Sequence, residues 1–229
     1  MAALPGLEST ADRPGTRRPT EPATATPRPW TATPFVPATR SLRVLTAAAS
    51  HCAGCPLYRA ATQTVFGDGP RDARVVLVGE QPGDREDVTG EPFVGPAGRV
   101  LDQCLEDAGI DRETVYLTNA VKHFKHEQRG KRRIHQRPTT EEINACSPWL
   151  TAELDVVRPA VVVALGATAA RSLSGRSVPI GSSRGRPIQV GGRPMIVTFH
   201  PSAVLRGDER AATIRAALVE DLRLAAGMA

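Results

Sequence analysis

VYLTNAVKHFKHEQRGKRRIHQRP, residues 115–138, joins an apolar run to the most basic segment of this chain. The apolar half, through Val121, predicts a buried strand that ends near Thr118 and Asn119. The basic half holds Glu127 as its single acid, and its cations are Lys122, Lys125, Arg129, Lys131, Arg132, Arg133 and Arg137. Such a run is often only a solvated face, so the rest of the chain must decide its role.

Apolar runs and amphipathic segments alternate along the sequence. We expect strands at 72–80, 115–121, 160–166 and 194–200, and helices at 41–50, 96–110, 140–157, from 167, and at about 209–226. A capping-box spacing of Thr139 and Glu142 opens the third of these helices. The alternation predicts the α/β class: a single domain with a mostly parallel central sheet and helices on both faces.

Composition bounds the domain organisation. Residues 1–40 hold eight Pro and show no periodicity, so we expect a disordered Pro/Thr/Arg-rich tail, followed by one domain over 41–229. The formal charge of +5 permits a polyanionic partner without requiring one. Of the 29 basic residues 26 are Arg, which is the better bidentate partner for phosphate.

The sequence also suggests a compartment. No apolar run approaches the ~20 residues that span a bilayer, so we expect no membrane contact. We expect a cytoplasmic protein, and the Arg-rich composition suggests a bacterial one. In that compartment four Cys are metal ligands or free thiols rather than disulfides.

Polar motifs stand where the expected strands end, the edge at which parallel sheets bind ligands. In chain order these motifs are GEQPG (79–83), GEPFVGPAG (90–98), TNAVK (118–122) and HPSAVLR (200–206). Together they resemble the uracil-DNA glycosylase superfamily, closest to its iron–sulfur family 4, over about residues 45–225. Two departures from family 4, GEQPG in place of GEAPG and the insertion RGKRRIH (129–135), resemble the UdgX-type members, which become covalently attached to uracil-containing DNA.

The resemblance implies a pocket for a uracil that is flipped out of the DNA. Phe93 would stack on the base, although it could also be a core residue. Asn119 would pair with the Watson–Crick edge, unless it merely terminates a strand. His200 would donate to uracil O2, or else be a packed histidine, and Gln81 would join the uracil-binding set.

The resemblance also implies two different nucleophiles. In the UdgX-type reaction His135 attacks C1′ of the sugar, and Glu80 takes or holds its second ring proton. In the family 4 reaction Glu80 instead assists an attacking water. The expected DNA contacts are Lys131, Arg132, Arg133 and Arg206.

Cysteines supply the expected metal site. Cys52 and Cys55 have chelating spacing, Cys146 matches a further family 4 ligand, and His123 stands where family 4 has another Cys. We therefore expect a [4Fe–4S] cluster on these four residues, with zinc as the alternative. Cys104, on the apolar face of its helix, is better explained as a core residue.

Three functions remain open. The first is a glycosylase that excises uracil, preferably from single-stranded DNA, and is trapped through His135 after one turnover. The second is a conventional multiple-turnover family 4 glycosylase. The third is a nucleic-acid-binding module without chemistry. In each case we expect a monomer.

Overall fold

The computed structural model describes residues 1–2, 29–206 and 209–229. Its central sheet has the strand order β2-β1-β5-β7-β6. The strands are β1 Val75–Gly79, β2 Tyr116–Asn119, β5 Val161–Leu165, β6 Pro187–Val190 and β7 Arg193–Thr198. Neighbouring strands pair in parallel except β6, which is antiparallel to β7. The expected mostly parallel sheet is confirmed.

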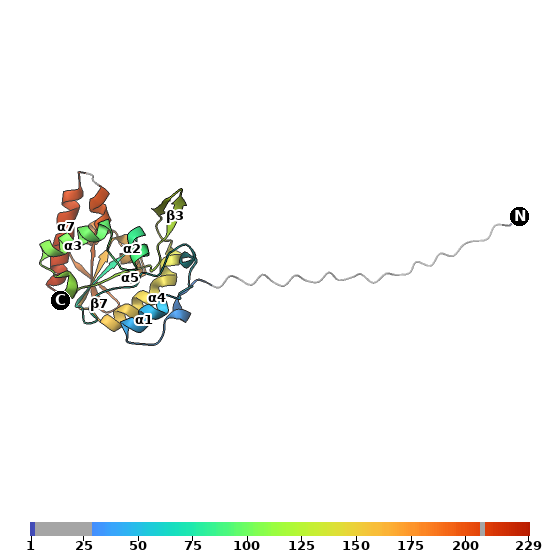
Figure 1. The fold of residues 1–229 in the computed structure, drawn as a ribbon, viewed down its shortest axis with the longest axis horizontal. Helices are drawn as coiled ribbons and strands as arrows, with labels where there is room; N and C mark the ends of the chain where they lie inside the picture. Colours follow the sequence, from blue (N-terminus) through green and yellow to red (C-terminus); the bar gives the residue numbers. More distant parts are fainter. Residues whose placement is uncertain (3–28, 207–208) are drawn as a thin grey trace.

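Helices cover both faces of the sheet (Figure 1). The α-helices are α1 Leu42–Ala49, α2 Asp84–Thr89, α3 Pro96–Ala108, α4 Thr140–Val157, α5 Ala167–Ser174, α6 Ile180–Ser183 and α7 Ala211–Ala226. The 3-10 helices are η1 Thr33–Phe35, η2 Pro56–Arg59, η3 Arg112–Thr114 and η4 Pro201–Arg206. Residues of α3 and α7 pack on one face of the sheet, and residues of α4 and α5 on the other. α1 packs against α4.

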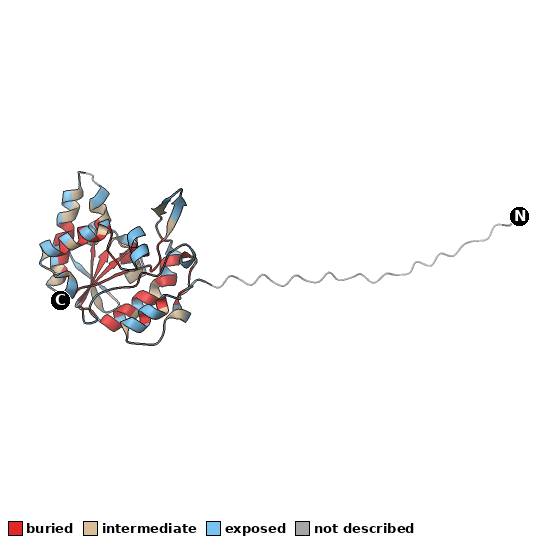
Figure 2. Cartoon of the chain, in the orientation of Figure 1, coloured by how far each residue is buried: buried red, intermediate tan, exposed pale blue. Residues whose placement is uncertain are grey.

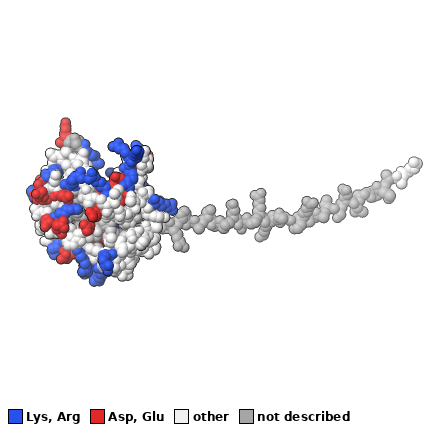
Figure 3. Space-filling view, in the orientation of Figure 1, with Lys and Arg blue, Asp and Glu red and all other residues white. Residues whose placement is uncertain are grey.

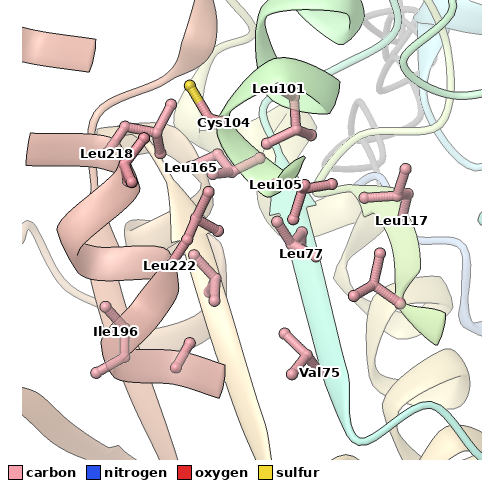
Figure 4. Packing of buried hydrophobic residues seen from close by; sticks show 14 of the residues in the cluster. Val75, Leu77, Leu101, Cys104, Leu105, Leu117, Leu165, Ile196, Leu218 and Leu222 are labelled. Atoms are coloured by element: carbon pink, nitrogen blue, oxygen red, sulfur yellow. The ribbon is translucent and has the colours of Figure 1, made fainter. Parts of the chain in front are cut away.

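Burial on both faces explains why the central strands are continuous apolar runs. Every residue of β1 and β5 is buried, as the red strands of Figure 2 show. Leu77 faces the α3 and α7 side, where it packs with Leu105 and Leu222 (Figure 4). Each such side chain contributes about 1.5–3 kcal/mol to folding. Cys104 lies fully buried in this same cluster.

The basic segment folds as a hairpin, which the sequence did not reveal. Strands β3 His126–Arg129 and β4 Arg132–His135 pair antiparallel, with Gly130 at the turn in a left-handed conformation (φ 59°). His126 and His135 are opposite each other in this register. The hairpin projects from the body of the domain (Figure 1).

Part of the N-terminal region differs from the expected tail. Residues 31–36 lie against α4: the backbone N–H of Ala32 donates to the carbonyl of Ala145 at 2.7 Å. Ala32 is 1% exposed. The backbone of Thr31 and Ala32 lies so close to Gly54 that a side chain at position 54 would collide with it. The expected disorder therefore does not reach Arg40. The remainder of the expected tail, residues 3–28, lies outside the described residues.

A helix that spans a membrane must be both long and apolar. Within residues 1–2, 29–206 and 209–229, no helix is long and apolar enough to cross a bilayer.

Candidate active site

The carboxyl ends of the parallel strands bring the predicted polar residues together. Glu80 follows β1, Asn119 ends β2, and His200 follows β7. Gly79 and Asn119 are register partners, and a side chain on Gly79 would collide with the Asn119 carboxamide. The same absent Cβ would lie 2.7 Å from the ring of Phe93. Because Gly79 has no side chain, both the Asn119 carboxamide and the Phe93 ring can lie close to the backbone at position 79.

Phe93 has an unusual backbone. Its φ is 60°, the left-handed region that a bulky residue rarely adopts. Gly98 makes this possible, because a side chain at that position would collide with the Phe93 carbonyl. The ring is 6% exposed and belongs to the α3 and α7 core cluster, yet it borders Asn119. Phe93 thus forms both a piece of the core and a wall of the site.

His200 has a defined tautomer. The backbone N–H of Ser202 donates to Nδ1 of His200 at 3.2 Å, and Oγ of Ser202 lies 2.8 Å from the same nitrogen. Burial, with the nearby His135 and Arg206 charges, lowers the pKa of His200 to about 4. The ring is therefore neutral near pH 7. Since Nδ1 accepts the Ser202 N–H, the ring proton sits on Nε2.

Glu80 connects the sheet to the hairpin. Its Oε1 lies 3.6 Å from Nε2 of His135, and its Oε2 lies 3.8 Å from Nε of Arg137. The Glu80 side chain is 19% exposed, whereas that of His135 is 50% exposed. The structure therefore places His135 within reach of both Glu80 and solvent, beside the neutral His200.

Gln81 anchors the root of the hairpin. Its Nε2 donates to the carbonyls of Lys125 and Gln136, and its Oε1 accepts from the Lys125 N–H. These bonds, of 3.1–3.2 Å, use both N–H donors of the carboxamide and one acceptor position of its oxygen. The Gln81 side chain therefore supports the hairpin, and its expected contact with uracil stays a prediction. Gln81 and the hairpin that holds the RGKRRIH segment are thus joined by direct hydrogen bonds.

Arg133 contacts acidic residues of α2. Its guanidinium forms ion pairs with Asp84 at 2.6 Å and Asp87 at 2.5 Å, and it donates to Oγ1 of Thr62. It also lies 5.5 Å above the ring of Phe124. Arg133 therefore clamps the hairpin to α2, and its expected contact with DNA stays a prediction.

The remaining predicted DNA contacts are exposed. Lys131 and Arg132 lie at the hairpin tip, where Figure 3 shows a group of basic side chains. A hollow of about 550 Å³ between these residues and Asp84 borders the tip. Arg206 is exposed at the end of η4, next to the half-exposed Leu205.

Three cysteines belong to one buried cluster, to which α4 contributes Cys146. Cys52, Cys55 and Cys146 are buried in one cluster with Trp149. The Trp149 Nε1–H donates to Sγ of Cys52 at 3.2 Å, and the Lys122 N–H donates to Sγ of Cys146 at 3.3 Å. N–H donors of this kind stabilise ligating thiolates. Burial raises the pKa of Cys146 to about 12, so a bound metal would have to supply the driving force for its deprotonation.

The fourth expected ligand, His123, makes a different contact. Its Nε2 lies 2.9 Å from Oγ1 of Thr64, and burial lowers its pKa to about 4. Over the described part of the chain, no three His, Cys, Asp or Glu side chains converge closely enough to bind a metal ion. The three thiols suit a metal in their chemistry and burial, whereas the imidazole is held by Thr64. Cys104 is excluded as a ligand because it lies in the other core.

Two residues at the site escaped the sequence reasoning. Phe124, 1% exposed, lies beneath the hairpin with its ring 4.9 Å from His126 and 6.1 Å from His135. Thr168 donates from Oγ1 to Oε2 of Glu80. Thr168 could have been found, because it comes soon after the end of the expected strand 160–166.

Fold and site together define a doubly wound α/β domain with a carboxylate, a carboxamide and two imidazoles at the carboxyl edge of its sheet. More particularly, the chain belongs to the Uracil DNA glycosylase superfamily, whose family model matches residues 66–223.

Relatives agree with this assignment. The chain is 41% identical over 186 residues to a type-4 uracil-DNA glycosylase of Thermotoga maritima, covering 80% of this chain and 92% of the relative. It is 34% identical over 175 residues to a type-4 uracil-DNA glycosylase of Pyrobaculum aerophilum, covering 72% and 85%. It is also similar to a type-5 uracil-DNA glycosylase of the same organism, at 32% identity over 154 residues, covering 58% and 63%.

Proposed function

We propose that this protein is a uracil-DNA glycosylase that becomes covalently attached at C1′ of the emptied sugar through His135. The observation that carries the proposal is the position of His135: it lies at the end of a cationic hairpin, 3.6 Å from the Glu80 carboxylate. Family membership supports the base-excision part of this proposal. The covalent part is drawn from the hairpin geometry and from the resemblance to UdgX-type members.

Uracil recognition falls to Phe93 and Asn119. A uracil inside a duplex is out of reach, so it must be flipped or taken from a single strand. The carboxamide of Asn119 can pair with the carbonyl acceptor and N–H donor on the uracil edge, while the ring of Phe93 offers a face for stacking. Since single-stranded DNA needs no unpairing, we expect it to be the preferred substrate.

Leaving-group stabilisation falls to His200. As the bond between C1′ and N1 breaks, negative charge builds on uracil O2. The neutral Nε2–H of His200 donates there, and one well-placed donor of this kind contributes about 3 kcal/mol to the transition state. Ser202 keeps the proton on Nε2 by occupying Nδ1.

The covalent step uses the imidazole of His135 as the nucleophile. One ring nitrogen attacks C1′ while the bond to N1 breaks, and uracil departs with that electron pair. The other ring nitrogen then gives its proton to Glu80, which leaves a neutral N-glycosylated histidine. Gln81 and Arg133 hold the hairpin in place over the sugar. Water is thereby kept from C1′, and one turnover ends the reaction.

DNA binding falls to the exposed cations Lys131, Arg132 and Arg206. Each neutralised phosphate releases counterions, so affinity should weaken steeply as salt rises. A monomer, with all these residues on one chain, satisfies the proposed site.

A [4Fe–4S] cluster on Cys52, Cys55, Cys146 and His123 completes the proposal. The three buried thiols and their N–H donors support it, and His123 would have to leave Thr64 to join them. When bound, the cluster would pin the loop after α1 to α4, a structural contribution. Anaerobically purified protein should carry about four irons per chain. A colourless protein that holds one zinc would contradict the cluster.

A second candidate is a conventional multiple-turnover glycosylase, in which Glu80 activates water. The 41% identity to a type-4 enzyme and the half-exposed His135 favour it.

One experiment separates the candidates. Wild-type protein is incubated with single-stranded uracil DNA and then denatured in SDS. An SDS-resistant band supports the covalent reaction, abasic DNA with free protein supports the second candidate, and unchanged DNA refutes both. His135→Ser should abolish the band, while His126→Ser, a matched change on the facing strand, should keep it.

A further inference from the structure

We propose that Thr168 is a positioning residue that aims the Glu80 carboxylate at His135. This inference rests on the proposed function, in which Glu80 receives a proton from that ring. Thr168 is the second residue of α5 and is 8% exposed. Its Oγ1 donates to Oε2 of Glu80.

The two oxygens of the Glu80 carboxylate face different residues. Thr168 holds Oε2, and Oε1 faces Nε2 of His135 at 3.6 Å. A carboxylate is planar, so holding one oxygen fixes the direction of the other. Arg137 competes for Oε2 from 3.8 Å, but its side chain is 81% exposed, and solvent weakens such a pair. Thr168 is therefore the contact that sets the orientation.

The turn before α5 places Thr168 at this point. Gly166 has a φ of 93°, and its N–H donates to the Thr198 carbonyl at 2.9 Å. A Cβ on Gly166 would lie only 3.2 Å from Cβ of His200, so α5 begins close beside the leaving-group histidine. Behind Thr168, Ala169 and Ala170 are fully buried. A hydroxyl on the first turn of a packed helix is a rigid support for a reacting group.

The consequence concerns one proton transfer. When a ring nitrogen of His135 bonds C1′, the proton on the other nitrogen must pass to Oε1 of Glu80. If the Thr168 hydroxyl is absent, the carboxylate can turn toward Arg137. Oε1 then leaves the path of that proton, and the reaction slows without any loss of DNA affinity.

The test compares three variants under single-turnover conditions at saturating single-stranded uracil DNA. Thr168→Val keeps the shape and removes the hydroxyl, whereas Thr168→Ser keeps the hydroxyl. Ser172→Ala is the matched control: Ser172 lies one turn later in α5, and its buried hydroxyl has no hydrogen-bond partner within the described residues.

We expect Thr168→Val to react about tenfold more slowly, with a half-saturating DNA concentration within about twofold of wild type. Thr168→Ser and Ser172→Ala should react within about twofold of wild type. In a Glu80→Gln background, adding Thr168→Val should cause no further loss. Wild-type rates in Thr168→Val, or the same tenfold loss in the Glu80→Gln background, would overturn the inference.

A wild-type protein that leaves uracil DNA unchanged would refute the proposed function rather than the role of Thr168. Crystal structures of Thr168→Val and Thr168→Ser then decide the inference. It stands if the Glu80 carboxylate turns away from His135 in the valine variant and not in the serine variant. It fails if the carboxylate keeps its place in both.

Discussion

Replacing Arg133 by methionine should free the hairpin from the domain. Methionine keeps an unbranched side chain but removes the guanidinium. Asp87 is 0% exposed, and among the described residues its carboxylate keeps only the Thr62 N–H as a hydrogen-bond donor, 3.0 Å from each of its oxygens. Removing one partner of a buried ion pair costs about 3–5 kcal/mol, and the pair with the exposed Asp84 adds at most about 1 kcal/mol.

The expected loss lies at the lower end of that range. Arg133 retains 19% exposure, so solvent already weakens the pair, and we expect about 3 kcal/mol. At 1.36 kcal/mol per factor of ten, the hairpin should open roughly 100-fold more often.

Hydrogen exchange measures this opening directly. The amide of Gln136 donates to the Lys125 carbonyl at 2.9 Å, at the hairpin root, and its protection should fall about 100-fold in Arg133→Met. Arg132→Met removes the same charge from the exposed neighbour and should leave protection unchanged. Equal protection of Gln136 in wild type and Arg133→Met would refute the clamp.

Three further predictions concern pH, recognition and the cysteines. In the folded protein the pKa of His200 is about 4, below its ordinary value of 6.5. The unfolded chain therefore binds more protons than the folded chain between pH 4 and pH 6.5. As a result, up to about 3 kcal/mol of folding stability is present above pH 6.5 and is lost as the pH falls to 4. His200→Gln should therefore flatten the decline of the urea midpoint over that window, and an unaltered decline would contradict the lowered pKa of His200. Asn119→Asp should slow uracil release about 100-fold in single-turnover assays, since a carboxylate would face the uracil carbonyl; a wild-type rate would exclude Asn119 from recognition. Cys52→Ser should lower the iron content and the unfolding midpoint, whereas Cys104→Ala should keep the iron, and iron loss in both would contradict the ligand assignment.

The sheet was predictable because burial on both faces demands continuous apolar runs. Each expected parallel strand contains or closely overlaps an observed one, and the expected helix 140–157 has the bounds of α4. β6 was missed, since its exposure alternates and it begins at Pro187, features of an edge strand. The hairpin was missed for a related reason: most of its side chains face solvent, so no apolar pattern marks it.

The site was predictable where a residue follows a strand and unpredictable where its partner is remote. Glu80, Asn119 and His200 all lie at the edge where parallel sheets bind ligands. The role of Arg133 depends on Asp84 and Asp87, 49 and 46 positions away. Pairings over such distances are made by the fold and leave no local signal.

The central claim is that His135 becomes covalently bonded to the sugar. The most direct test is to measure the mass of the peptide that contains His135. Wild-type protein is reacted with single-stranded uracil DNA, the DNA is digested with nuclease, and tryptic peptides are sequenced by mass spectrometry. We predict a deoxyribose phosphate remnant on His135, with free uracil released in equal amount. Uracil released in excess of protein with His135 unmodified, or a remnant on any other residue, would contradict the account.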